Sequence, residues 1–159
     1  MRTAIIYASK HGTTEKVAQN IQSLLDEDKA QLFNLKNNKH FDLSQFEQVI
    51  VGGSIHAGTI QKRVKNFVDQ HRPELLQKQI GLFICCMHEQ EAETEFNNAY
   101  PEILCSHAVS KKIMGGEFLF ERMNLIEKAL VKKIAGINAS VSKIKEEKIR
   151  ELVEEMQKG

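Results

Sequence analysis

Residues 4–14, AIIYASKHGTT, join an apolar run to a polar loop at the point where a helical pattern begins. The run at 3–8 is short and apolar, as expected of a buried strand, and the residues after the loop repeat apolar side chains at helical spacing. The loop itself, SKHGTT, contains three hydroxyls, a histidine and a glycine. Because the N-terminus of a helix presents unpaired N–H groups and a partial positive charge, this loop is suited to wrap its backbone around an anion such as phosphate.

The rest of the chain repeats this alternation of short strands and helices. Strands are predicted at 3–8, 30–35, 47–52, 80–86 and 108–116, and helices at 15–27, 59–71, 89–100, 119–135 and 143–157. Such alternation implies a parallel sheet covered on both faces, with right-handed crossovers. We therefore predict an α/β fold in a single domain over 1–159: a doubly wound five-stranded parallel sheet, order 2-1-3-4-5, with an extra helix after strand five.

Composition and charge exclude several classes of protein. A net charge of +1 gives no argument for a nucleic-acid partner. No apolar run approaches the roughly 18 residues of a membrane span, and the N-terminal apolar stretch is too short for a signal peptide. Three cysteines without a C-x-x-C pair fit a reducing compartment, and no clustered Cys/His spacing indicates a metal site. We therefore expect a cytoplasmic protein without a metal, in which Cys85 and Cys86 are buried and inert.

In a sheet of this order, ligands bind beyond the carboxyl ends of strands one and three. The loop SKHGTT follows strand one, and GGSIHAGT follows strand three, so two loops rich in glycine and hydroxyls converge on one crevice. The first loop matches neither G-x-x-x-x-G-K-[ST] nor G-x-G-x-x-G. A plain strand-to-helix turn with capping threonines is the alternative interpretation of that loop taken alone.

Two other protein classes with related architecture do not fit. A receiver domain needs an aspartate at the end of strand three, where Gly52 and Gly53 stand. A low-molecular-weight phosphatase needs C-x5-R, but the sixth residue after Cys85 is Glu91 and the sixth after Cys86 is Ala92.

The loop S-K-H-G-T-T resembles the flavodoxin phosphate loop, [TS]-x-[TS]-G-x-T, with His11 replacing the usual middle hydroxyl. This resemblance implies a flavodoxin-like fold and an FMN cofactor whose phosphate is bound by Ser9, Lys10, His11, Gly12, Thr13 and Thr14. It also implies that two further loops flank the flavin ring, mainly through backbone groups: Ser54, Ile55, His56, Ala57 and Gly58 after strand three, and Cys86, Met87 and His88 after strand four. Gly58 is the candidate for a peptide that changes orientation with the redox state of the flavin.

The near-neutral charge, and the absence of Trp and Tyr from both ring loops, differ from acidic electron-carrier flavodoxins. The pattern GGSIHAGTIQKRVKNFV and the inserted helix are more similar to the flavodoxin-type protoporphyrinogen dehydrogenases. That resemblance implies an FMN-dependent oxidoreductase of haem biosynthesis, with a hydrophobic small-molecule substrate, a quinone-type acceptor and His56 as the candidate catalytic residue. The alternatives are a small electron-transfer flavodoxin that serves redox partner proteins, a binding module that has lost its flavin, and a plain loop histidine at position 56.

The segment 118–135 combines apolar residues at helical spacing with an excess of basic ones. Its expected inward stripe is Leu119, Met123, Ile126, Leu130 and Ile134, and its basic residues are Arg122, Lys128, Lys132 and Lys133. Three interpretations follow from this pattern: a helix packed on the edge of the sheet, a substrate lid, or a peripheral contact at the inner face of the cell membrane.

Overall fold

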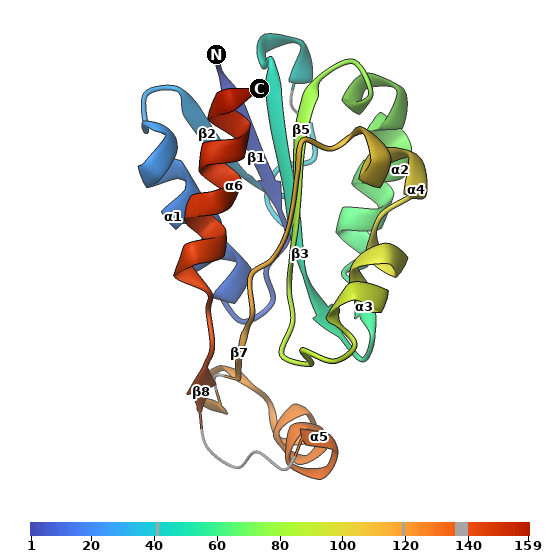
Figure 1. The fold of residues 1–159 in the computed structure, drawn as a ribbon. Helices are drawn as coiled ribbons and strands as arrows, with labels where there is room; N and C mark the ends of the chain where they lie inside the picture. Colours follow the sequence, from blue (N-terminus) through green and yellow to red (C-terminus); the bar gives the residue numbers. More distant parts are fainter. Residues whose placement is uncertain (41, 119, 136–139) are drawn as a thin grey trace.

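The computed structural model describes residues 1–40, 42–118, 120–135 and 140–159, and its centre is a parallel sheet (Figure 1). Its parallel strands run in the order β2-β1-β3-β5-β6, which confirms the predicted fold class and strand order. Their bounds are Thr3–Tyr7 for β1, Ala30–Asn34 for β2, Gln48–His56 for β3, Gln79–Cys85 for β5 and Ser110–Ile113 for β6.

Helices cover both faces of this sheet (Figure 1). One face packs on α1, Thr13–Leu25, and α6, Glu146–Lys158. The other face packs on α2, Lys62–Leu75, α3, Ala92–Ala99, and α4, Glu102–His107. A 3₁₀ turn, η1, spans Leu43–Gln45. Along β1 the side chains of Ile5 and Tyr7 enter the α1/α6 core, and those of Ala4 and Ile6 enter the opposite core. Burial on both faces explains why these strands are apolar runs rather than alternating patterns.

Strand β3 continues four residues beyond the predicted end at residue 52. Its residues Gly53 and Ser54 still pair with β5, and Ile55 and His56 then pair antiparallel with β4, Thr59–Ile60. Ala57 and Gly58 form the turn between β3 and β4 with φ of 50° and 76°. Two positive φ values are typical of a tight hairpin turn, so the predicted loop after strand three is a β-hairpin.

The insertion after β6 is carried on a second, two-stranded sheet. In it β7, Glu117–Phe118, pairs with β8, Val141–Ser142, and residues 117–142 are called the inserted segment below. Within it η2 spans Phe120–Arg122 and α5 spans Leu125–Ala135. Leu119 and residues 136–139, and the side chains of Phe118, Phe120, Ile134 and Ala135, lie outside the described part.

The predicted start of this helix was wrong. Instead of running from residue 119, α5 begins at Leu125, because Asn124 caps it: the Asn124 side-chain oxygen accepts the N–H of Glu127 at 2.8 Å. The helix lies beyond the loop end of the sheet, near the lower edge of Figure 1. Leu125 and Ile126 are 83% and 80% exposed, although Ile126 was expected to point inward. The described side chains of this helix therefore show that the interpretation as a helix packed on the sheet edge is wrong.

Candidate functional site

A cavity of about 700 Å³ lies beyond the carboxyl ends of β1, β3 and β5. The first loop contributes Lys10, His11 and Thr13, the β3–β4 hairpin contributes Ser54 to Gly58, and the segment after β5 contributes Cys86, Met87 and His88. The fourth wall comes from Gly116 and from the inserted segment that follows it, through Glu117, Met123, Glu127, Leu130 and Val131. The topology therefore brings together the three loops that the sequence analysis singled out.

The loop SKHGTT has the backbone of an anion-binding turn. Gly12 adopts φ 96°, a left-handed conformation that favours glycine, and its N–H donates to the Ser9 hydroxyl at 3.0 Å. Gly12 also occupies the N-cap position of α1, where no side chain caps the helix. The first-turn N–H groups of α1 are therefore not satisfied by a capping side chain and point toward the loop. Ser9, Gly12 and Thr14 shape this turn from below and do not themselves line the cavity.

A buried network fixes this loop to the β3–β4 hairpin. The hydroxyl of Thr14, which is fully buried, is hydrogen bonded to that of Ser54. Gln61 joins the same network, because its Oε1 accepts the N–H of Ser54 at 2.8 Å and its Nε2 donates to the Ala8 carbonyl at 3.3 Å. This role of Gln61 was not predicted, because residue 61 fell inside the helix expected at 59–71, whereas in the structure it lies between β4 and α2.

His56 and His11 form the polar wall of the cavity. Their rings meet edge to face with centroids 5.9 Å apart, and His11 Nε2 lies 2.6 Å from Glu127 Oε2. His56 keeps an exposed edge, but partial loss of hydration, followed by the nearby charges of Lys10 and His11, lowers its pKa to about 4. At neutral pH the His56 imidazole is therefore uncharged, and the same shift makes it a weaker base than an ordinary histidine.

The cysteines at the end of β5 are poor nucleophiles in this environment. Burial raises the pKa of Cys85 to about 12, and burial together with Glu95 raises that of Cys86 to about 12. Both thiols therefore stay protonated at neutral pH, as an inert role requires. Glu95 is buried at the cavity wall, and its Oε2 has no hydrogen-bond partner within the described residues. No pattern in the sequence indicates that Glu95 is buried.

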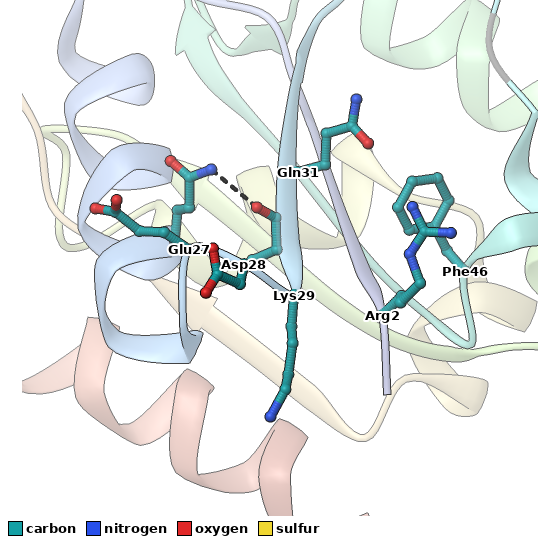
Figure 2. A pocket seen from close by; sticks show the side chains of 8 residues that line it. Arg2, Glu27, Asp28, Lys29, Gln31 and Phe46 are labelled. Carbon is teal, nitrogen blue, oxygen red and sulfur yellow. Dashed lines mark hydrogen bonds between the residues drawn. The ribbon is translucent and has the colours of Figure 1, made fainter.

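A second cavity, of about 270 Å³, lies at the opposite end of the sheet (Figure 2). There the Arg2 guanidinium lies over the Phe46 ring at 5.1 Å, beside the turn that carries Glu27, Asp28 and Lys29. This cavity adjoins the amino end of β1, far along the strands from the loops that line the larger one. It therefore takes no part in the candidate site.

Neither a metal centre nor a membrane span is found in the part of the chain that the structure describes. There, no three His, Cys, Asp or Glu side chains are grouped so that they could hold a metal ion. Within the same residues, no helix has both the length and the apolar character needed to cross a membrane.

Comparison with solved structures identifies the fold. A short-chain flavodoxin associated with a non-canonical PDU bacterial microcompartment has a TM-score of 0.60 at 15% identity, over 99% of this chain and 98% of that one. Fusobacterium nucleatum flavodoxin bound to flavin mononucleotide gives 0.52 at 19% identity, over 70% of each chain. Rubredoxin oxygen:oxidoreductase from Desulfovibrio gigas gives 0.60 at 17% identity over 98% of this chain, which spans only 34% of that protein. At these identities the likeness concerns the fold alone.

Sequence comparison identifies the family. No curated protein sequence matches the chain. A family profile described as a flavodoxin domain matches residues 4–144, which include the five parallel strands except Thr3 of β1, the loop SKHGTT and the whole inserted segment. With the strand order and converging loops described above, this match shows that the protein belongs to the flavodoxin domain family.

Proposed function

We propose that this protein binds FMN and is an FMN-dependent oxidoreductase. The observation that carries the proposal is one cavity of about 700 Å³ bounded by an uncapped, glycine-containing anion loop, two further loops and an apolar wall. Its volume lies within the usual range for cofactor sites, about 300–1,000 Å³. A bound flavin supplies reversible electron transfer that no side chain of this chain provides.

The residues of the cavity fit FMN. A phosphate suits the positive end of α1, where Gly12 lets the backbone approach closely and Thr13 adds a hydroxyl group at the cavity wall. Thr14 supports this position from below through its hydrogen bond to Ser54. In this proposal the hairpin residues from Ser54 to Gly58 and the residues Cys86 to His88 flank the ring. Ile55 and Met87 offer apolar contact there, because no Phe, Tyr or Trp lines the described wall.

For the substrate, we favour a hydrophobic reduced tetrapyrrole such as protoporphyrinogen IX, with a quinone as electron acceptor. Met123, Leu130 and Val131 give the cavity an apolar wall that comes from the inserted segment, outside the flavodoxin sheet. Oxidation of such a substrate releases electron pairs and protons, and reduction of the quinone to quinol consumes both. His56 is the candidate proton acceptor because its side chain lies at the cavity wall.

The alternative function is that of a small electron-transfer flavodoxin serving redox partner proteins. Its support is the match of residues 4–144 to the flavodoxin domain family. Such a carrier exchanges electrons with a protein partner and needs no apolar substrate wall. The third interpretation, a binding module without flavin, is disfavoured by the uncapped anion loop.

Two measurements test the proposal. An absorbance spectrum of the purified protein with added FMN should show bound-flavin bands near ~450 nm, and their absence after dialysis would refute FMN binding. Anaerobic mixing with protoporphyrinogen should then bleach these bands, and quinone should restore them as fluorescent protoporphyrin appears. A protein that is reduced only by a flavodoxin reductase, and never by protoporphyrinogen, is an electron carrier instead.

We also propose that α5 is a peripheral contact with an anionic membrane surface. Leu125, Ile126 and Leu130 are 83%, 80% and 48% exposed. Lys128 and Lys132 follow Leu125 by three and seven residues, so they lie beside it on the helix surface. An exposed apolar face flanked by lysines has charge and polarity complementary to acidic lipid headgroups. A hydrophobic substrate could then reach the cavity from the lipid phase past Leu130.

A further inference from the structure

The inserted segment places a carboxylate beside the first turn of α1. The Thr13 hydroxyl donates to Glu117 Oε1 at 3.1 Å, while Lys16 Nζ and the Ser142 hydroxyl donate to Oε2 at 3.0 and 2.8 Å. The Glu117 side chain is only 2% exposed. Burial opposes its ionisation, but the hydrogen bonds from Ser142, Lys16 and Thr13 outweigh burial and lower its pKa. The ionised Glu117 carboxylate thus already accepts the hydrogen bond of the Thr13 hydroxyl, which is one of the donors of the loop SKHGTT.

The same segment places a guanidinium against the loop. Arg122 Nη1 donates to the His11 carbonyl at 2.9 Å. It also lies so close to Gly12 that a Cβ atom at that position would collide with it. The side chain is otherwise exposed, and the carbonyl is its only hydrogen-bond partner among the described residues.

Arg122 differs from the other cations around the loop in having no carboxylate partner among the described residues. Lys10 Nζ lies 3.3 Å from Glu127 Oε2, and Lys16 Nζ lies 3.0 Å from Glu117 Oε2. Both lysines are therefore already neutralised by the inserted segment. A guanidinium has a planar set of donors that matches a phosphate well, and an unpaired one has the most to gain from that contact.

We infer that the inserted segment completes the phosphate site: Arg122 pairs with the FMN phosphate, and the phosphate displaces Glu117 from Thr13. The inference rests on the proposed FMN binding. In the free protein, Glu117 supplies the negative charge that the positive end of α1 attracts. The dianionic phosphate takes over the Thr13 hydroxyl, while Glu117 keeps its contacts with Lys16 and Ser142.

The Arg122 part is tested by dissociation constants for FMN and riboflavin, measured through quenching of flavin fluorescence. Arg122→Ala should weaken FMN binding about tenfold or more, as expected for loss of a charge-assisted hydrogen bond, and leave riboflavin within about twofold. Arg122→Lys should recover part of the loss. Lys132→Ala, which removes an exposed charge of the same segment, is the matched control. Unchanged FMN affinity in Arg122→Ala, or an equal loss for both flavins, overturns this part.

The Glu117 part makes the opposite prediction. Glu117→Gln removes the competing charge and should tighten FMN binding severalfold, again without changing riboflavin binding. Glu121→Gln is the matched control, because Glu121 is an exposed carboxylate of the same segment whose partner is Ser140. Unchanged or weaker FMN binding in Glu117→Gln overturns the displacement.

Inorganic phosphate separates this inference from the proposed function. It should raise the melting temperature of the flavin-free wild type and not that of Arg122→Ala. If neither flavin binds but phosphate still stabilises the protein through Arg122, the proposed function fails and the anion site stands. If both flavins bind the wild type and phosphate does not stabilise it, the proposed function stands and the inferred site is overturned.

Discussion

The exposed apolar face of α5 gives the proposed membrane contact a magnitude that can be tested. The exposed fractions of Leu125, Ile126 and Leu130 amount to about two whole side chains. Full burial of one such side chain contributes about 1.5–3 kcal/mol, so insertion of this face contributes at most about 3–6 kcal/mol. Such a contribution alone gives weak, reversible attachment, so binding must depend on the lysines.

The lysine contribution is estimated separately. A lysine near an anionic surface contributes about 1 kcal/mol, so Lys128, Lys132 and Lys133 together contribute about 3 kcal/mol, or roughly 150-fold in the partition coefficient. Flotation with anionic vesicles should therefore capture the wild type at about 10 mM salt, where the Debye length is about 30 Å, and much less at 0.15 M, where it is about 8 Å. Neutral vesicles should capture it at least a hundredfold less efficiently.

Two variants separate the contributions to this binding. Lys128/Lys132/Lys133→Glu should abolish flotation, while the matched charge reversal on α2, Lys62/Arg63/Lys65→Glu, should leave it unchanged. Leu125/Ile126→Asn should lower capture at every salt concentration, because it removes the apolar term. No capture of the wild type by anionic vesicles at low salt, or equal loss in both charge-reversal variants, would refute the membrane contact and leave a substrate lid as the role of α5.

Three further predictions concern the site and the core. Thr14→Glu should weaken FMN binding by at least about a hundredfold, because a carboxylate directly beneath the loop breaks the hydrogen bond to Ser54 and repels the phosphate, and like charges brought together cost several kcal/mol; wild-type affinity in a variant that unfolds cooperatively would contradict the proposed phosphate position. His56→Ala should alter the flavin potential or turnover. Because the pKa of His56 is lowered from 6.5 to about 4, the folded state binds fewer protons than the unfolded state between these values, so wild type loses stability as pH falls through this range. In urea unfolding, His56→Ala should lose less stability than wild type over the same pH range, and identical dependence of stability on pH in the two proteins would contradict this prediction. Tyr100→Phe should destabilise the protein by about 1–2 kcal/mol in urea unfolding, since the buried hydroxyl donates to the carbonyls of Val51 and Phe83; an unchanged midpoint would show that these bonds contribute nothing.

Local patterns predicted most of the sheet correctly because its strands are buried on both faces. The segments around β1 and β5 are continuous apolar runs, which are typical of strands in a covered parallel sheet. The helix predicted at 59–71 corresponds to α2, in which Val64, Phe67 and Val68 are buried. The short α4 was missed, because six residues carry too little periodicity to indicate a helix.

The incorrect element boundaries lie where a helix cap or the pairing of a strand decides the end of an element, because local periodicity indicates neither. The helical spacing at 119–135 was real, but the cap at Asn124 moved the start of α5 to Leu125. The predicted end of β3 at residue 52 was wrong because pairing with β5 and β4 extends the strand. Hydrogen bonds to other strands decide such boundaries, and apolar content alone does not.

The sequence by itself determined the fold class, the strand order and which loops meet at one end of the sheet, because these follow from local periodicity, from the chirality of crossovers and from the strand order common to small doubly wound sheets. Only the tertiary structure showed that Gln61 joins two of those loops, and that Glu117 and Arg122 reach the loop SKHGTT from more than a hundred residues away. Charged side chains of the inserted segment carry no local signal of their partners. Their roles depend on distances that exist only once β7 and β8 pair and hold that segment against the loop.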